Sequence, residues 1–90
     1  METRKVVINT CWGGFGLSDK ARTALGAGYE FDWEIARDDP KLVEVVEKLG
    51  AEANRRHAHL KVVEIPKDVV WFIHDYDGKE HVAEQHRTWL

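Results

Sequence analysis

The stretch that decides the fold is residues 69–84, VVWFIHDYDGKEHVAE. Two runs rich in β-branched and aromatic residues, 69–76 and 79–84, flank the dipeptide Asp77-Gly78. A two-residue hairpin turn needs positive φ at both positions, which Asp and Gly adopt more readily than most residues. The pattern therefore predicts an antiparallel hairpin over this stretch.

Three further strands are expected before the hairpin. Residues 4–11, RKVVINTC, cluster β-branched side chains and read as a buried strand. Residues 29–35, YEFDWEI, alternate between apolar and acidic side chains, which is typical of a half-buried strand with an acidic outer face. A last strand over 60–65 is stopped by Pro66.

Two helices are expected between these strands. Ser18 is a good N-cap for the first helix, which Gly26 and Gly28 end. Asp39-Pro40 begins the second helix, and apolar residues then recur at helical spacing. Gly50 weakens or ends that helix.

The resulting order, β-α-β-α-β-β-β, predicts an α+β protein with one mixed sheet and two helices packed on it. Ninety residues, 43% of them hydrophobic, suffice for one domain over 1–90 with one core. The formal net charge of -3 is not that of a general nucleic-acid binder, so nucleic acid is not an expected partner.

The single cysteine excludes a disulfide scaffold. No signal-peptide pattern is present, and no apolar run approaches the roughly 18 residues of a membrane span. We therefore expect a cytoplasmic protein without a membrane partner. The sequence is compatible with a monomer and with a homo-oligomer.

The candidate ligand site is the glycine-rich loop between the first strand and the first helix. Glycines let backbone N–H groups approach a phosphate, and a helix N-terminus adds a positive field. The loop lacks the lysine of the Walker pattern, and a tight turn with one aromatic residue packed inward is the alternative. The candidate ligand-binding residues are Asn9, Thr10, Trp12, Gly13, Gly14, Phe15, Gly16 and Ser18.

Two constellations resemble catalytic or metal sites. Cys11 lies near a helix N-terminus, where a thiolate is stabilised, but no cysteine–histidine signature accompanies it. The hairpin places His74 opposite His81, whereas zinc takes three or four ligands. We expect a structural cysteine, no metal and no cofactor.

The hairpin also places Asp75 opposite Glu80. Two facing carboxylates could act as a general acid and base, or one could meet an arginine such as Arg87. No pocket can be argued for them from the sequence, so no catalytic residue is predicted.

Two stretches resemble one family of small proteins encoded by tailed phages and prophages. They are VVINTCWGGFGLS at 6–18 and a discontinuous stretch from 38 to 89 that includes LKVVEIP, YDG and VAEQHRTW. Family members often carry Tyr in place of Trp12, and acidic or aromatic residues in place of His74 and His81. The resemblance implies a phage accessory protein made in an infected bacterium, and it implies no particular activity.

The function expected from these observations is binding without catalysis. The target would be a host or defence protein in the cytoplasm of the infected bacterium. The alternative is a small-ligand or nucleotide-binding domain that holds a small phosphorylated ligand at the glycine-rich loop. A minimal enzyme that uses Cys11 with a histidine is the third hypothesis.

Overall fold

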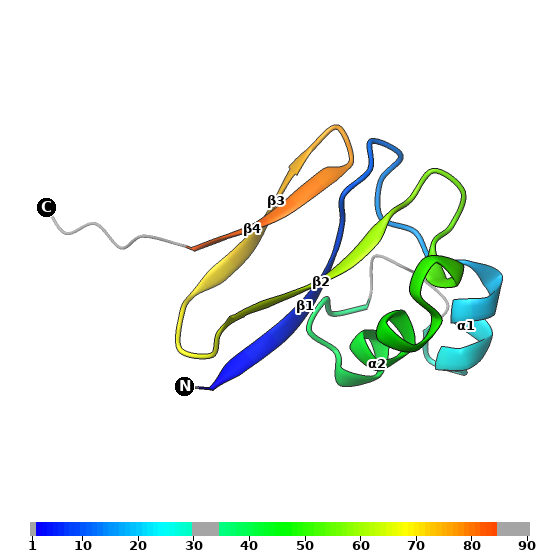
Figure 1. Ribbon diagram of the computed structural model, residues 1–90, viewed down its shortest axis with the longest axis horizontal. Coiled ribbons are helices and arrows are strands. Elements are labelled where there is room, and N and C mark those ends of the chain that lie inside the picture. The colour runs from blue at the N-terminus through cyan, green and yellow to red at the C-terminus, as the bar shows by residue number, and fades with distance from the viewer. Residues whose placement is uncertain (1, 30–34, 85–90) are drawn as a thin grey trace, which may run out of the picture.

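The computed structural model describes residues 2–29 and 35–84, which form an α+β domain of two helices and four strands, with a short 3-10 helix (Figure 1). The elements are β1 (Thr3–Asn9), α1 (Asp19–Leu25), α2 (Pro40–Leu49), the 3-10 helix η2 (Gly50–Ala53), β2 (Leu60–Pro66), β3 (Trp71–Tyr76) and β4 (Lys79–Glu84).

The predicted hairpin is confirmed. Strands β3 and β4 pair antiparallel, with His74 opposite His81 and Asp75 opposite Glu80. The turn residues Asp77 and Gly78 have φ values of 50° and 88°. Both therefore lie in the positive-φ region that a two-residue turn of this type requires.

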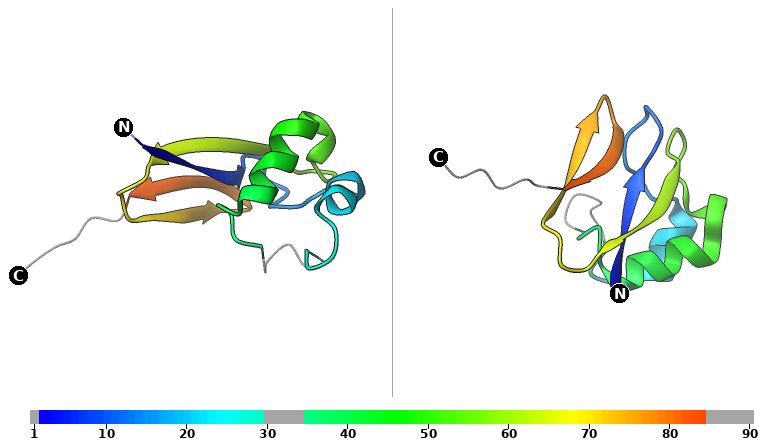
Figure 2. Two further views of the ribbon diagram at one scale, coloured as in Figure 1. Left: turned by 90° about the horizontal axis from the view of Figure 1, so that it is seen from below. Right: turned by 60° about the vertical axis from the view of Figure 1, so that its left-hand side comes forward.

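The described strands form two antiparallel pairs, β1–β2 and β3–β4. They lie side by side in the order β3, β4, β1, β2 (Figure 2). The strand expected over 29–35 falls mostly on residues 30–34, outside the described residues. The predicted single mixed sheet and its exact strand order therefore stay predictions.

Strands β1 and β4 are not paired through their backbones, because N–H groups on the outer edge of β1 already have other partners. The Val7 N–H donates to the Arg37 carbonyl at 2.8 Å, and the Asn9 N–H donates to the Glu80 carboxylate at 2.9 Å. These two donors point away from β2, toward the hairpin. Because a loop carbonyl and a side chain already satisfy them, β4 lies beside β1 without backbone pairing.

Both helices begin at the predicted caps. The Ser18 hydroxyl accepts from the Ala21 N–H at 3.1 Å, and the Asp39 carboxylate accepts from the Lys41 N–H at 2.8 Å. Gly50, with φ of 58°, ends α2 as expected, and the chain continues as the 3-10 helix η2.

The core lies between the helices and one face of the β1–β2 pair, and it receives no residue from the hairpin. Within the described residues, Glu80 is the one buried side chain of β3 and β4. No helix in the described ranges is long and apolar enough to cross a membrane. Val6 and Ile8, on the opposite face of β1, are also buried. The buried residues of the cluster beneath the helices are Val7, Leu17, Ala21, Leu25, Ile35, Leu42, Val43, Val45, Val46, Ala53 and Leu60.

Candidate functional site

The hairpin is attached to the rest of the fold by a buried polar network centred on Asn9. The Asn9 side chain is fully buried, and its Nδ2 donates to the carbonyls of Cys11 and Gly78, at 2.6 Å each. Its Oδ1 accepts the His59 N–H at 2.8 Å. One side chain thus joins the glycine-rich loop, the hairpin turn and the segment before β2.

Glu80 and Arg37 form the second part of this network. The Glu80 side chain is only 5% exposed. Its carboxylate accepts hydrogen bonds from both terminal guanidinium nitrogens of Arg37, one of them at 2.9 Å. The guanidinium also lies 3.7 Å from the centroid of the Phe15 ring. A bidentate ion pair stacked on an aromatic ring holds its geometry well, so this contact fixes β4 against the glycine-rich loop.

This network separates the two facing carboxylates of the hairpin. Glu80 is committed to Arg37, whereas exposed Asp75 accepts the Gly78 N–H within the turn at 2.8 Å. Each carboxylate thus has its own structural partner. The arginine that Glu80 meets is Arg37; Arg87 lies outside the described residues.

The face of the hairpin opposite to Asp75 and Glu80 is exposed to solvent. Phe72, His74 and Tyr76 alternate along β3 and share one face with His81 of β4. Trp12 of the glycine-rich loop reaches this face, with its ring centroid 5.8 Å from that of Tyr76 in an edge-to-face contact. We call these five residues the aromatic face.

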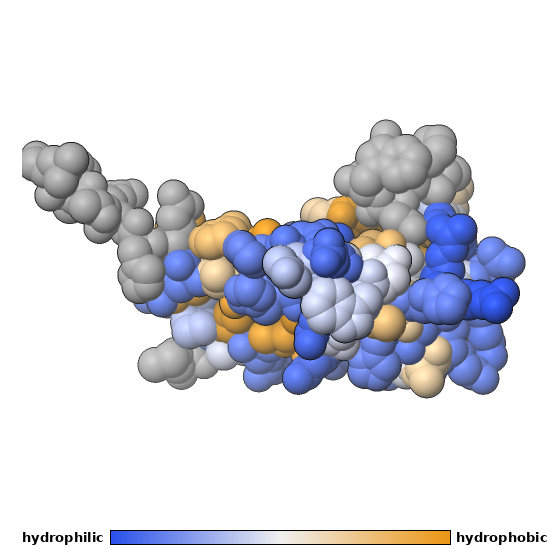
Figure 3. Space-filling model, turned by 90° about the horizontal axis from the view of Figure 1, so that it is seen from above, coloured by the Kyte–Doolittle hydropathy of each residue, from blue (hydrophilic) through white to orange (hydrophobic). Residues whose placement is uncertain are grey.

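Its three largest side chains are well exposed. Trp12 is 58% exposed, Phe72 44% and Tyr76 65%, and the Lys79 ammonium lies 5.6 Å from the Trp12 ring. In the view from the hairpin turn, hydrophobic residues are visible on the hairpin side of the molecule, whereas the end near α1 is mostly hydrophilic (Figure 3). The aromatic face is therefore an amphipathic surface with apolar bodies and polar tips.

The facing histidines have ring centroids 4.8 Å apart. In the described part of the chain, no group of three or more His, Cys, Asp or Glu residues is arranged to hold a metal ion. The Cys11 thiol is half-buried and, among the described residues, forms no hydrogen bond with a histidine. What the structure shows at Cys11 is the polar contact of its backbone with Asn9.

Glycines in the loop allow close approach of other backbone segments. A Cβ on Gly13 would collide with the His57 carbonyl, and one on Gly16 would lie 2.9 Å from Arg55 Cδ. Gly14 has φ of 88° with open space around its Cα. Two of the three glycines thus accommodate the segment 55–57 of the same chain.

Two pockets lie on either side of that segment. One of about 420 Å³, which we call the arginine pocket, is lined by Leu17, Ser18, Asp19, Arg22, Asn54, Arg55 and Arg56. The other, the loop pocket, has about 340 Å³ and is lined by Gly13, Gly14, Phe15, Gly16, Arg55, Arg56, His57 and Ala58.

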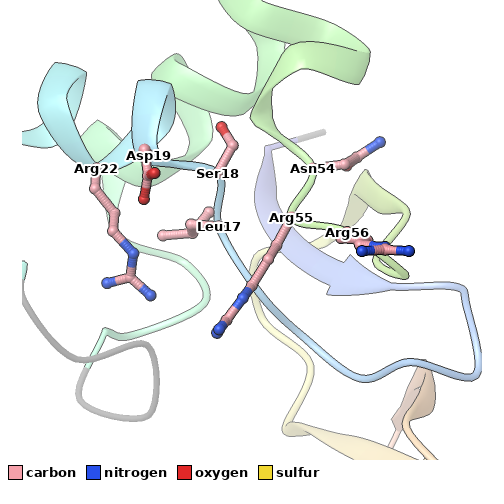
Figure 4. A pocket seen from close by; sticks show the side chains of 7 residues that line it. All are labelled: Leu17, Ser18, Asp19, Arg22, Asn54, Arg55 and Arg56. Atoms are coloured by element: carbon pink, nitrogen blue, oxygen red, sulfur yellow. The ribbon is translucent and has the colours of Figure 1, made fainter.

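Arg55 and Arg56 line both pockets. The side chains of Arg22 and Arg55 extend in the same direction past Leu17, and Arg56 lies apart from them (Figure 4). Within residues 2–29 and 35–84, neither Arg55 nor Arg56 takes part in an ion pair. Their charge is thus available to an anion.

The structure does not bring the predicted ligand-binding residues together in one site. Gly13, Gly14, Phe15 and Gly16 line the loop pocket, and Ser18 lines the arginine pocket. Asn9 is buried in the polar network, the Thr10 hydroxyl lies 2.8 Å from Nδ1 of His59, and Trp12 belongs to the aromatic face.

The arginines that line the pockets (Arg22, Arg55 and Arg56) and Arg37 are not among the candidate site residues predicted from the sequence. The adjacent pair Arg55-Arg56 is visible in the sequence, but its position at two pockets depends on the fold. No comparable local signal marks Arg37, whose partner is 43 residues away.

Comparison with known proteins found no matching family model, curated protein or solved structure. The geometry and the sequence therefore carry the functional argument.

Proposed function

We propose that this protein acts by binding another protein through its aromatic face, without catalysing a reaction. The single observation that carries the proposal is the exposure of Trp12, Phe72 and Tyr76 on one surface. Large apolar groups gathered on a surface mark interaction sites, and Trp and Tyr are the residues that contribute most where proteins bind.

The hydrogen bonds of Asn9 near the aromatic face also favour a binding function. Asn9 donates to the carbonyl of Cys11, directly before Trp12, and to the carbonyl of Gly78 in the turn that follows Tyr76. One buried residue thus holds the backbone next to both aromatic residues. Preorganisation of this kind reduces the entropy lost on binding.

The resemblance to phage and prophage proteins supports a choice of target. We propose a host or defence protein in the cytoplasm of an infected bacterium. The apolar bodies of the aromatic face would enter a partner's apolar groove, and Lys79 beside Trp12 would meet a carboxylate at the rim.

A pull-down from bacterial lysate tests the proposal. The wild type is compared with the double variant Trp12→Ser/Tyr76→Thr, which removes two exposed rings and keeps strand-compatible Thr in β3. The matched control is Lys61→Thr/Glu64→Thr, at exposed positions of β2. We expect a partner to be retained by the wild type and the control but lost by the aromatic variant; equal retention by all three would contradict the proposal.

A second function rests on a separate observation, the shared position of Arg55 and Arg56 at both pockets. Planar guanidinium groups bind phosphate oxygens with two parallel hydrogen bonds. The backbone of Gly13–Gly16 lies beside the same arginines. We therefore propose a small phosphorylated compound as the second kind of ligand.

Thermal unfolding with inorganic phosphate and a panel of nucleotides tests this second function. A ligand at a hundred times its Kd stabilises the fold by about 2.7 kcal/mol, and each kcal/mol raises the Tm of a small domain by roughly 4–8 °C. The shift should disappear in Arg55→Gln/Arg56→Gln and persist in Lys61→Gln. Absence of any shift in the wild type, or a shift that survives loss of both arginines, would exclude the site.

A further inference from the structure

Within residues 2–29 and 35–84, no strand pairs with the outer edge of β3. In a hairpin with a two-residue turn, the residues that flank the turn form a hydrogen-bonded pair, and such pairs then recur at every second residue. The backbones of Phe72, His74 and Tyr76 therefore point toward β4, and those of Trp71, Ile73 and Asp75 point away from it. Figure 2 shows β3 as the outermost strand of the four.

These outward groups have no partner in the described part of the chain. No backbone hydrogen bond outside the strand pairs involves Trp71, Ile73 or Asp75. The strand also lacks the lysine or proline that commonly protects an exposed edge, and its one charged side chain is Asp75. Unpaired N–H and C=O groups in this spacing fit one kind of occupant, which is another extended strand.

We propose that this occupant is β3 of a second copy of the chain, paired antiparallel about a two-fold axis at Ile73. In this register Ile73 faces Ile73 of the second copy, and Trp71 faces Asp75 of the second copy. Every outward N–H and C=O group of the strand then has a partner. The two hairpins become one four-stranded antiparallel sheet.

The side chains of the strand complement themselves in this register. Phe72 comes to lie beside His74 of the second copy, and Val70, which is 58% exposed, comes to lie beside Tyr76 of the second copy. No like charges face each other, because Asp75 meets Trp71. A slip of two residues in either direction leaves one outward residue without a partner inside the strand.

The pairing goes beyond the proposed function and does not depend on it. A two-fold axis perpendicular to the sheet keeps equivalent faces on one side. The aromatic faces of the two copies would then form one continuous surface. The outer edge of β3 would be used by the dimer, and the face would stay open to another partner.

Sedimentation equilibrium of the full chain tests the dimer. We expect the apparent mass to rise from the 10.4 kDa of one chain toward twice that value as protein concentration increases. In Ile73→Pro the mass should stay monomeric, because the missing N–H points to the free edge and not to β4. Monomeric wild type at every concentration would overturn the proposal, as would an undiminished dimer of this variant.

Disulfide trapping decides the case if Ile73→Pro fails to fold. In a Cys11→Ser background, Ile73→Cys should form an intermolecular disulfide under mild oxidation, because facing residues in a hydrogen-bonded pair lie about 5.5 Å apart at Cα. The matched control is His81→Cys on β4, which should stay monomeric. Equal crosslinking at both positions, or none at position 73, would overturn the register.

Discussion

At the scale of single residues, Asn9 and Glu80 determine where the hairpin lies. Asn9 satisfies three backbone segments at once, and Glu80 neutralises Arg37. Buried polar groups are costly when they lose a partner, so each residue of this network depends on the others. These hydrogen bonds and the Arg37 ion pair attach the hairpin to the rest of the fold, and its apolar residues Trp71, Ile73, Val82 and Ala83 are only half-buried.

The first prediction concerns the ion pair. Glu80→Gln leaves the half-buried Arg37 guanidinium without a counter-ion, and we expect it to lower the free energy of unfolding by about 2–3 kcal/mol. Chemical denaturation measures the change. The control is Glu52→Gln, which removes the exposed pair with Lys20 and should cost less than about 0.5 kcal/mol. Similar small losses in both variants would show that the Arg37 contact does not stabilise the fold.

The second prediction concerns alkaline pH. Burial of Tyr29, followed by its hydrogen bond to Asp39, raises the pKa of the phenol above its ordinary value. The unfolded chain therefore ionises first as pH rises, so this contribution is full below about pH 10 and is lost above it. Urea midpoints measured between pH 8 and 11 should fall more steeply for the wild type than for Tyr29→Phe. Parallel curves would contradict the assignment.

The sequence predicts the pairing of Asp75 with Glu80, but not the inward orientation of Glu80. The facing of Asp75 and Glu80 follows from the turn alone, because the Asp77-Gly78 dipeptide fixes the register. That Glu80 points inward to Arg37 depends on a contact 43 residues distant, and no local pattern reports such a contact. Glu80 and Val82 share one face of β4, because they are two residues apart in a strand, and Val82 is half-buried.

At the scale of elements, the predicted helices and the hairpin are confirmed because local chemistry determines them. Ser18, Asp39 and Gly50 act where the sequence places them. The relation between the two strand pairs was not predictable in this way. It depends on which groups occupy the outer edge of β1, and those groups are the Arg37 carbonyl and the Glu80 carboxylate.

The third prediction compares two glycines with the same backbone conformation. Gly14 and Gly78 both have φ of 88°, but a Cβ on Gly78 would lie 2.6 Å from both the Gly14 nitrogen and the Trp12 carbonyl oxygen, whereas Gly14 has open space. Gly14→Ala should cost only the conformational strain, about 1–2 kcal/mol. Gly78→Ala should cost clearly more, because the hairpin turn must also move off the loop. Equal losses in denaturation would mean that the turn and the loop are not in close contact.

At the scale of the whole molecule, the apolar core and the exposed aromatic face belong to different parts of the fold. The helices and the β1–β2 pair contain the apolar core, and the hairpin contributes no residue to it. The hairpin instead presents the aromatic face, while the two pockets lie at the segment 55–57. The surface proposed for a protein partner and the site proposed for an anion are thus separate parts of the fold.

Site-specific photocrosslinking shows whether the aromatic face contacts the proposed partner. A photoreactive phenylalanine analogue replaces Tyr76 in one variant and exposed Thr23 of α1 in the control, and each is irradiated in bacterial lysate. We expect a crosslink from position 76 to a protein other than a second copy of the chain, and no such product from position 23. Crosslinks from position 23 alone, or equal yields from both positions, would contradict it.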